Sequence, residues 1–200
     1  MKHYQRLEGM VAATFTPMDA RGDINLSVID KYADLMAESG MAGVFVCGTT
    51  GESHSLTTDE RKAILAQWIK SARKRFKVIA HVGSNCQLEA MELARHAQKV
   101  EADAFAAMAP CFFKPSSVKD LVDFFTPIAQ SAPDLPFYYY NMPSMTGVSL
   151  SVPSFLIEGK KTMPNLVGTK FTHNNLMEMG EWVNVVEIFL ICHSVHVPGQ

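Results

Sequence analysis

Residues 44–82 read VFVCGTTGESHSLTTDERKAILAQWIKSARKRFKVIAHV, and this stretch decides the fold. It begins with the short apolar run Val44–Cys47 and ends with a second run, Val78–Val82. Between them, Thr57-Thr-Asp-Glu60 has the pattern of a capping box, which predicts a helix. Short β-branched runs bounded by turn residues are typical of strands that are buried on both faces. The stretch is therefore predicted to be one strand–helix–strand unit.

The same unit recurs along the chain. Strand-like runs start at residues 11, 44, 78, 104, 137 and 167, and helical patterns fill the intervals, with one more opened by Asn174. A regular repeat of about 30 residues predicts a parallel sheet with right-handed crossovers.

Two architectures have such a sheet, an open doubly wound fold and a (β/α)8 barrel. No GxGxxG motif follows the first run, whereas polar residues follow nearly every run, which favours the barrel. A full barrel typically needs about 250 residues, and this chain has 200. We therefore predict an α/β fold of (β/α)8 TIM-barrel type, incomplete, with about six βα units. They would span residues 1–183, and residues 184–200 would form a divergent tail.

Composition excludes several classes of function. Hydrophobic residues make up 48% of the chain, which is typical of a packed globular protein. The formal net charge is −2, so nothing favours nucleic acid or a membrane surface as a partner. No segment is typical of a signal peptide or a membrane helix. The four cysteines lack metal-ligand spacing, which favours reduced thiols in a cytoplasmic protein.

Lys170 ends the sixth predicted strand and carries the strongest chemical signal. Burying an ammonium group inside an apolar strand is unfavourable, so such a lysine tends to lose its proton. A neutral amine attacks ketones to form a Schiff base. A lysine at the rim of the sheet is an equally good interpretation of the pattern alone.

Two other strand ends carry candidate residues. Gly48-Thr-Thr-Gly51 could hold a carboxylate through its backbone amides and hydroxyls, although an ordinary turn explains it too. Tyr140 would share a strand face with Tyr138 and present its phenol to the site, unless it is only a buried aromatic. His54, His81 and His173 have no ligand spacing, so no metal is expected.

Three segments together resemble one family. Gly48-Thr-Thr-Gly-Glu52, Tyr140-Asn-Met-Pro143 and Gly168-Thr-Lys-Phe-Thr172 are similar, in order and spacing, to the motifs of the N-acetylneuraminate lyase and dihydrodipicolinate synthase superfamily. The resemblance implies a barrel, usually a homotetramer. It implies Lys170 as the Schiff-base lysine and Tyr140 as the proton-transfer phenol. Thr49 and Thr50 would hold the substrate carboxylate, and Thr172 would lie near the substrate.

Two departures favour the lyase branch of the family over the synthase branch. Met145 stands where the synthases usually carry an arginine, and Ala109-Pro-Cys-Phe-Phe113 lacks their relay tyrosine. The resemblance then implies retro-aldol cleavage of N-acetylneuraminate, a sialic acid, to N-acetylmannosamine and pyruvate, with no cofactor. A synthase-like or other pyruvate-dependent aldolase is the alternative.

The tail does not match the Gly-x-Asp-Glu segment that the family carries after its seventh strand. Glu187 lacks the context of that acid, and the run from Val185 to Cys192 could form a seventh strand or promote aggregation. A second hypothesis therefore stays open: a non-catalytic, shortened subunit of the lyase.

Overall fold

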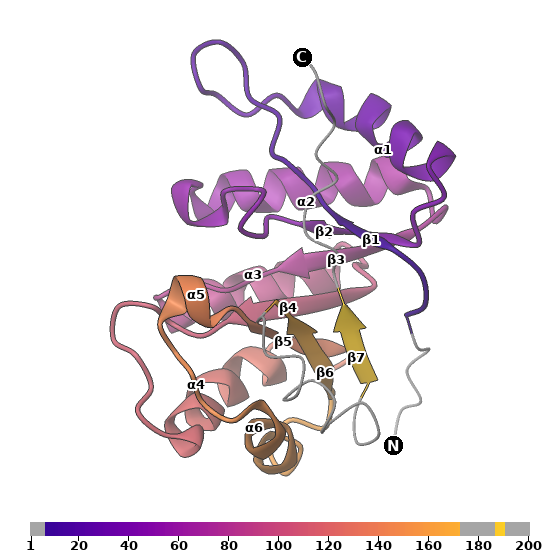
Figure 1. The fold of residues 1–200 in the computed structure, drawn as a ribbon. Coiled ribbons are helices and arrows are strands. Elements are labelled where there is room, and N and C mark those ends of the chain that lie inside the picture. The colour runs from indigo at the N-terminus through magenta and orange to yellow at the C-terminus, as the bar shows by residue number, and fades with distance from the viewer. Residues whose placement is uncertain (1–6, 173–186, 191–200) are drawn as a thin grey trace.

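The computed structural model describes residues 7–172 and 187–190, and within them seven parallel strands form one sheet. The strands follow one another in chain order, each beside the next, as Figure 1 shows. They are β1 (Val11–Ala13), β2 (Gly43–Val46), β3 (Lys77–His81), β4 (Ala104–Met108), β5 (Phe137–Asn141), β6 (Leu166–Phe171) and β7 (Glu187–Leu190). Each of the six predicted strands starts within one residue of its expected position.

Helices connect the strands. They are α1 (Ile29–Glu38), α2 (Thr58–Ala72), α3 (Gln87–Lys99), α4 (Val118–Gln130), α5 (Pro143–Thr146) and α6 (Val152–Gly159). The capping box predicted at Thr57 and Glu60 is present at the start of α2. The short helix α5 was not predicted, and the helix expected after Asn174 lies outside the described residues. No helix in the described ranges is long and apolar enough to cross a membrane.

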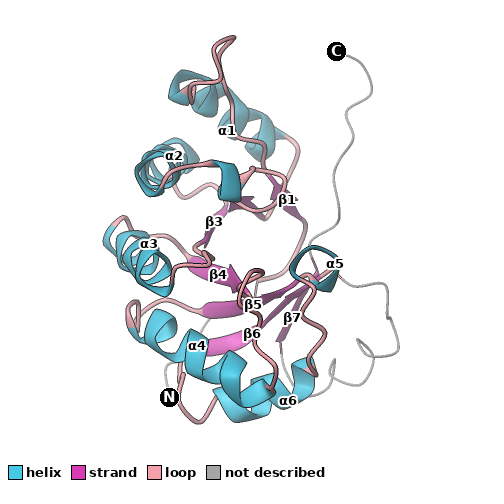
Figure 2. Cartoon of the chain, turned by 90° about the vertical axis from the view of Figure 1, so that its left-hand side faces the viewer, coloured by secondary structure: helices cyan, strands magenta, loops and turns pink. Residues whose placement is uncertain are grey.

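The position of the helices decides between the two architectures. Figure 2 shows α1, α2, α3, α4 and α6 together on one face of a curved sheet. A doubly wound fold would carry helices on both faces. The chain instead forms part of a (β/α)8 barrel, and the prediction of an incomplete barrel is confirmed.

Two layers of buried side chains follow from the alternation along each strand. Between helices and sheet, Tyr139 packs against Phe125 and Phe155, with ring centroids 5.6 and 4.8 Å away. Tyr138 and Tyr140 belong to the other layer, on the concave face. The prediction that Tyr138 and Tyr140 share a face, opposite Tyr139, is therefore confirmed.

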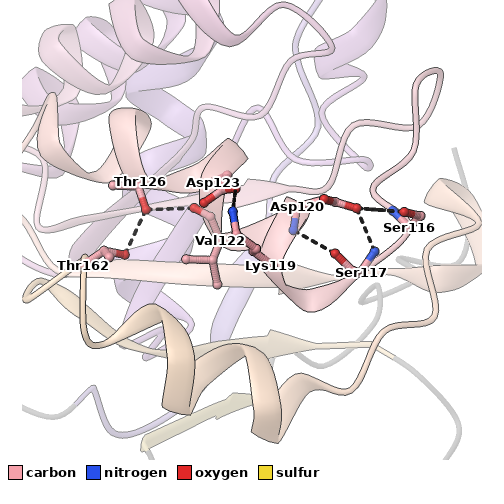
Figure 3. Close-up of polar contacts among 8 residues, drawn as sticks. All are labelled: Ser116, Ser117, Lys119, Asp120, Val122, Asp123, Thr126 and Thr162. Carbon is pink, nitrogen blue, oxygen red and sulfur yellow. Dashed lines mark hydrogen bonds and ion pairs between the residues drawn. The ribbon is translucent and has the colours of Figure 1, made fainter.

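Helix α4 shows how local sequence fixes an element between two strands (Figure 3). The Ser117 hydroxyl accepts a hydrogen bond from the Asp120 amide at 3.1 Å, and the Asp120 carboxylate accepts one from the Ser117 amide at 3.0 Å. This reciprocal pair satisfies two amides that a helix start leaves unpaired. Farther along, the Thr126 hydroxyl lies 2.9 Å from that of Thr162, which joins α4 to the segment before β6.

The tail contributes a strand to the same sheet. Strand β7 pairs in parallel with β6, from Gly168 opposite Glu187 to Phe171 opposite Leu190. A seventh strand was one of the two outcomes expected for this apolar run. The division of the chain at residue 183 stays a prediction.

Candidate active site

A tight turn follows β2 at the carboxyl edge of the sheet. Cys47 has the left-handed backbone angle φ 55°, which reverses the chain direction immediately after the strand. The amides of Glu52 and Ser53 then donate to the carbonyls of Thr49 and Gly48, at 3.0 and 3.2 Å. This closed turn presents Thr49 at the edge of the concave face.

Gly48 is required by close packing. A Cβ at this position would lie 2.7 Å from two ring atoms of Phe45, well inside van der Waals contact. The turn is thus pressed against the inner-face ring of its own strand. Gly48 is not among the glycines with a positive φ, so close packing and not backbone conformation requires a glycine here.

Tyr140 comes from β5 and meets this turn. Its phenol oxygen lies 3.2 Å from Thr49 Oγ1, and both groups lie near Met142 Sδ, at 3.0 and 3.3 Å. Burial raises the pKa of the Tyr140 phenol, and the Thr49 hydrogen bond offsets part of this increase. At neutral pH the phenol therefore holds its proton and can exchange it with a bound group.

Lys170 comes from β6, directly opposite Tyr140 in the strand register. Its side chain is buried, with 3% exposure, and its Nζ lies 3.5 Å from the centre of the Tyr140 ring and 5.0 Å from that of Phe45. Desolvation lowers the pKa of the Lys170 amine to about 7. The rim-lysine interpretation is therefore wrong, because the amine lies inside the sheet's concave layer and is substantially neutral at pH 7.

The two remaining threonines lie at the ends of the same strands. Thr172 follows β6, and its hydroxyl donates to the Asn141 carbonyl at 2.8 Å, so its side chain ties β6 to the end of β5. Thr50 is half-buried in the turn after β2. The structure thus brings Thr49, Tyr140 and Lys170 into one cluster, while the Thr172 hydroxyl is engaged by the backbone of Asn141.

Sequence reasoning missed His81 and Phe45 as members of this cluster. Both lie on the concave face, and both rings pack against Tyr140, with centroids 5.7 and 5.4 Å away. His81 had been considered only as a metal ligand. Its position in an apolar strand, at the alternation that faces inward, was the signal that could have found it. No group of acidic, histidine or cysteine side chains suited to a metal ion occurs among the described residues.

A pocket of about 350 Å³ opens beside the cluster. It lies between the turns that follow β2, β4 and β5, and Thr49 connects it to Tyr140. Its wall is made of residues from these three turns: Thr49, Glu52, Ser53, His54, Ser55, Met108, Ala109, Cys111, Met145 and Thr146.

A buried amine with a lowered pKa, a phenol and a hydroxyl-bearing turn thus lie together at the carboxyl edge of the sheet. Comparison with known families matches residues 6–194 to the model of the dihydrodipicolinate synthetase family. The chain belongs to this family. N-acetylneuraminate lyases, the branch of the family that the sequence motifs resemble, recur among its relatives.

The N-acetylneuraminate lyase of Gallus gallus is 43% identical over 185 residues, which are 92% of this chain and 60% of that protein. The enzyme of Mus musculus is 42% identical and is covered over 57% of its length. The chain therefore spans about three fifths of the length of these relatives.

Solved structures of the family have the same fold over the part that this chain covers. The N-acetylneuraminate lyase of Proteus mirabilis superposes with a TM-score of 0.88 at 36% identity, over 92% of this chain and 63% of that one. The dihydrodipicolinate synthase of Aquifex aeolicus superposes with a TM-score of 0.80 at 32% identity, over 86% of this chain and 58% of that one. Both branches of the family thus share this fold.

Proposed function

We propose that this chain carries the Schiff-base site of an N-acetylneuraminate lyase, a class I aldolase that cleaves N-acetylneuraminate to N-acetylmannosamine and pyruvate. The observation that carries the proposal is the burial of Lys170, whose pKa is lowered to about 7 beside the Tyr140 phenol. A lysine desolvated in this way is a nucleophile at neutral pH without help from a metal or an organic cofactor.

The reaction begins when the Lys170 amine adds to the C2 ketone of the open-chain sugar acid. Loss of water gives an iminium ion, which withdraws electrons from the C3–C4 bond. As the carbinolamine loses water, the Tyr140 phenol gives its proton to the departing hydroxyl. When the C3–C4 bond then breaks, the resulting phenolate takes the C4 hydroxyl proton, directly or through the substrate carboxylate, and the aldehyde leaves. The remaining enamine takes a proton at C3, and water then releases pyruvate and the free amine.

The turn after β2 supplies the other interaction that this reaction needs. Thr49 and Thr50, with the backbone amides of the turn, would hold the carboxylate next to the ketone. Thr49 is already within hydrogen-bond distance of Tyr140, so a carboxylate bound there would lie beside the phenol. Thr172 would contact the substrate from the end of β6.

Two features favour the lyase reaction over the synthase reaction. Met145 lines the pocket beside the site, where an uncharged thioether gives no counter-charge for a second carboxylate. Cys111 lines the same pocket, and its segment, Ala109–Phe113, carries no tyrosine that could serve as the synthase's relay. The Gallus gallus and Mus musculus proteins, at 43% and 42% identity, are both N-acetylneuraminate lyases. A synthase-like aldolase is the alternative if the preferred aldehyde carries a carboxylate.

We also propose a homotetramer in the cytoplasm. Phe112 and Phe113 stack edge to face at the surface, 76% and 86% exposed, and an exposed apolar pair favours contact with another subunit. Cys47, Cys86 and Cys111 are free thiols, which suits a reducing compartment.

The first experiment is incubation with pyruvate and borohydride, followed by intact-mass measurement. The expected result is one pyruvyl adduct, which is absent in Lys170→Ala and retained in Lys160→Ala, a matched change at an exposed lysine. A folded, soluble chain that forms no adduct would overturn the proposal and favour the non-catalytic subunit. Release of N-acetylmannosamine from N-acetylneuraminate would then separate the lyase from other aldolases.

A further inference from the structure

We infer that His81 is a positioning residue of the proposed reaction, and that its hydrogen bond and its ring have separate tasks. The inference rests on the proposed function. His81 ends β3 and is buried, with 2% exposure, on the concave face beside the reactive cluster. It touches both halves of the site: the turn that would hold the carboxylate and the phenol that would move the proton.

The hydrogen bond acts on the turn. His81 Nδ1 lies 2.8 Å from the carbonyl oxygen of Cys47, and because a carbonyl only accepts, Nδ1 must carry the proton. Cys47 is the residue with φ 55°, a conformation that a side chain with a Cβ disfavours. The donor from β3 thus holds the carbonyl of the residue whose backbone reversal presents Thr49 and Thr50.

The ring acts on Tyr140. The two rings are nearly perpendicular, at 89°, with centroids 5.7 Å apart, and the His81 ring also lies 6.0 Å from that of Phe45. The Lys170 amine lies over the rings of Phe45 and Tyr140. His81 therefore fills the layer beneath both of them and restricts the direction of the phenol.

The backbone of His81 is itself fixed. The buried guanidinium of Arg61 donates to the His81 carbonyl at 2.8 Å and to that of Gly83 at 3.0 Å. Gly83 leaves room for the imidazole, since a Cβ there would lie 2.6 Å from His81 Nε2. A side chain held on this many sides is suited to hold its neighbours in place.

The test compares His81→Asn with His81→Leu. Both changes remove the ring, but the Asn amide nitrogen stands the same number of bonds from Cα as Nδ1 and keeps a donor. Two quantities are measured with pyruvate alone: the concentration that gives half-maximal borohydride-trapped adduct, and the rate at saturation of methyl proton exchange into deuterated water. The exchange proceeds through the enamine, as a C3 proton leaves and a deuteron replaces it.

The half-saturating pyruvate concentration is expected to rise roughly five- to tenfold in His81→Leu and to stay within about twofold of the parent in His81→Asn. The saturated exchange rate is expected to fall roughly tenfold or more in both. Circular dichroism checks folding. If His81→Leu does not fold, His81→Phe serves as the donor-less variant for the half-saturating concentration, and the task of the ring is then tested with His81→Asn alone.

Equal half-saturating concentrations in the Asn and donor-less variants would overturn the inference about the hydrogen bond. An unchanged exchange rate in both ring-less variants would overturn the inference about the ring. If the parent chain itself formed no adduct, the proposed function would fail, and the role of His81 would fail with it. That outcome is distinguishable because it already appears without any substitution.

Discussion

Raising the pH from about 5 to 9 is expected to increase the reactivity of Lys170, with a midpoint near pH 7. The reason is its place between two aromatic rings, where burial lowers the amine pKa from 10.5 to about 7. At pH 7 about half of the population is neutral, roughly a thousandfold more than for an ordinary lysine. The same difference corresponds to a desolvation penalty of roughly 5 kcal/mol for the charged form.

Competitive labelling with trace acetic anhydride measures this directly. The chain and a free model amine, N-acetyl-lysine amide, are labelled together across the pH range, and each lysine peptide is quantified by mass spectrometry. The Lys170 peptide is expected to titrate near pH 7, although burial slows its absolute rate. A midpoint above about pH 9 would refute the reasoning, because the amine would then be charged at neutral pH and unable to attack a ketone.

Four further predictions follow from single contacts. Lys170→Met should stabilise the chain by a few kcal/mol at pH 6 and by progressively less as the pH rises from 7 towards 10.5, because the lowered pKa makes only the charged form unfavourable in the folded state. Urea unfolding at both ends of this range measures the gain in stability, and a gain that does not change with pH would contradict the prediction. Tyr140→Phe should keep the borohydride-trapped pyruvate adduct, because the ring beside the amine remains, but should slow release of N-acetylmannosamine by roughly 10²-fold or more, because the phenol hydroxyl is lost. An unchanged release rate would show that Tyr140 does not transfer the proton. Gly48→Ala should weaken pyruvate binding, because the new Cβ would lie 2.7 Å from the Phe45 ring and displace the turn. Titration of the trapped adduct with pyruvate measures this, and an unchanged half-saturating concentration would show that the turn accommodates the methyl group. Ser117→Ala should lower the free energy of unfolding by about 1 kcal/mol through loss of the α4 cap, without affecting adduct formation; equal denaturation midpoints would argue against the cap.

The sheet was predictable because strand burial leaves a direct trace in sequence. Runs such as Val44–Cys47 are apolar on both faces, which is typical of a parallel sheet covered on both sides. That the helices all cover one face of the sheet was harder to predict, because this depends on the curvature of the sheet, which the hydrophobic pattern of a single strand does not show. Helix α5 escaped notice because it has only four residues and lies in a turn rich in small residues.

The positions of candidate site residues were predictable where a polar or charged residue stands in an apolar strand. Lys170 stands out because a charge in an apolar strand needs an explanation, and Tyr140 follows from the alternation around it. His81 did not stand out, since a histidine can be buried neutral without a functional reason. Its role depends on distances to Cys47 and Tyr140, which are 34 and 59 positions away and meet only through the strand register.

The reactivity of the amine and the recognition of the whole substrate are separable properties of this fold. The two rings over which the Lys170 amine lies belong to β2 and β5, and the turn that would bind the carboxylate follows β2, so these groups lie within residues 45–170. Pyruvate presents only a ketone and a carboxylate, and it therefore tests this part of the site by itself. An aldehyde must also contact the pocket beside Thr49, whose wall includes Met145 and His54. Formation of the pyruvate adduct would thus establish the Schiff-base chemistry. The relative rates with different aldehydes would show how the residues of the pocket wall select the substrate.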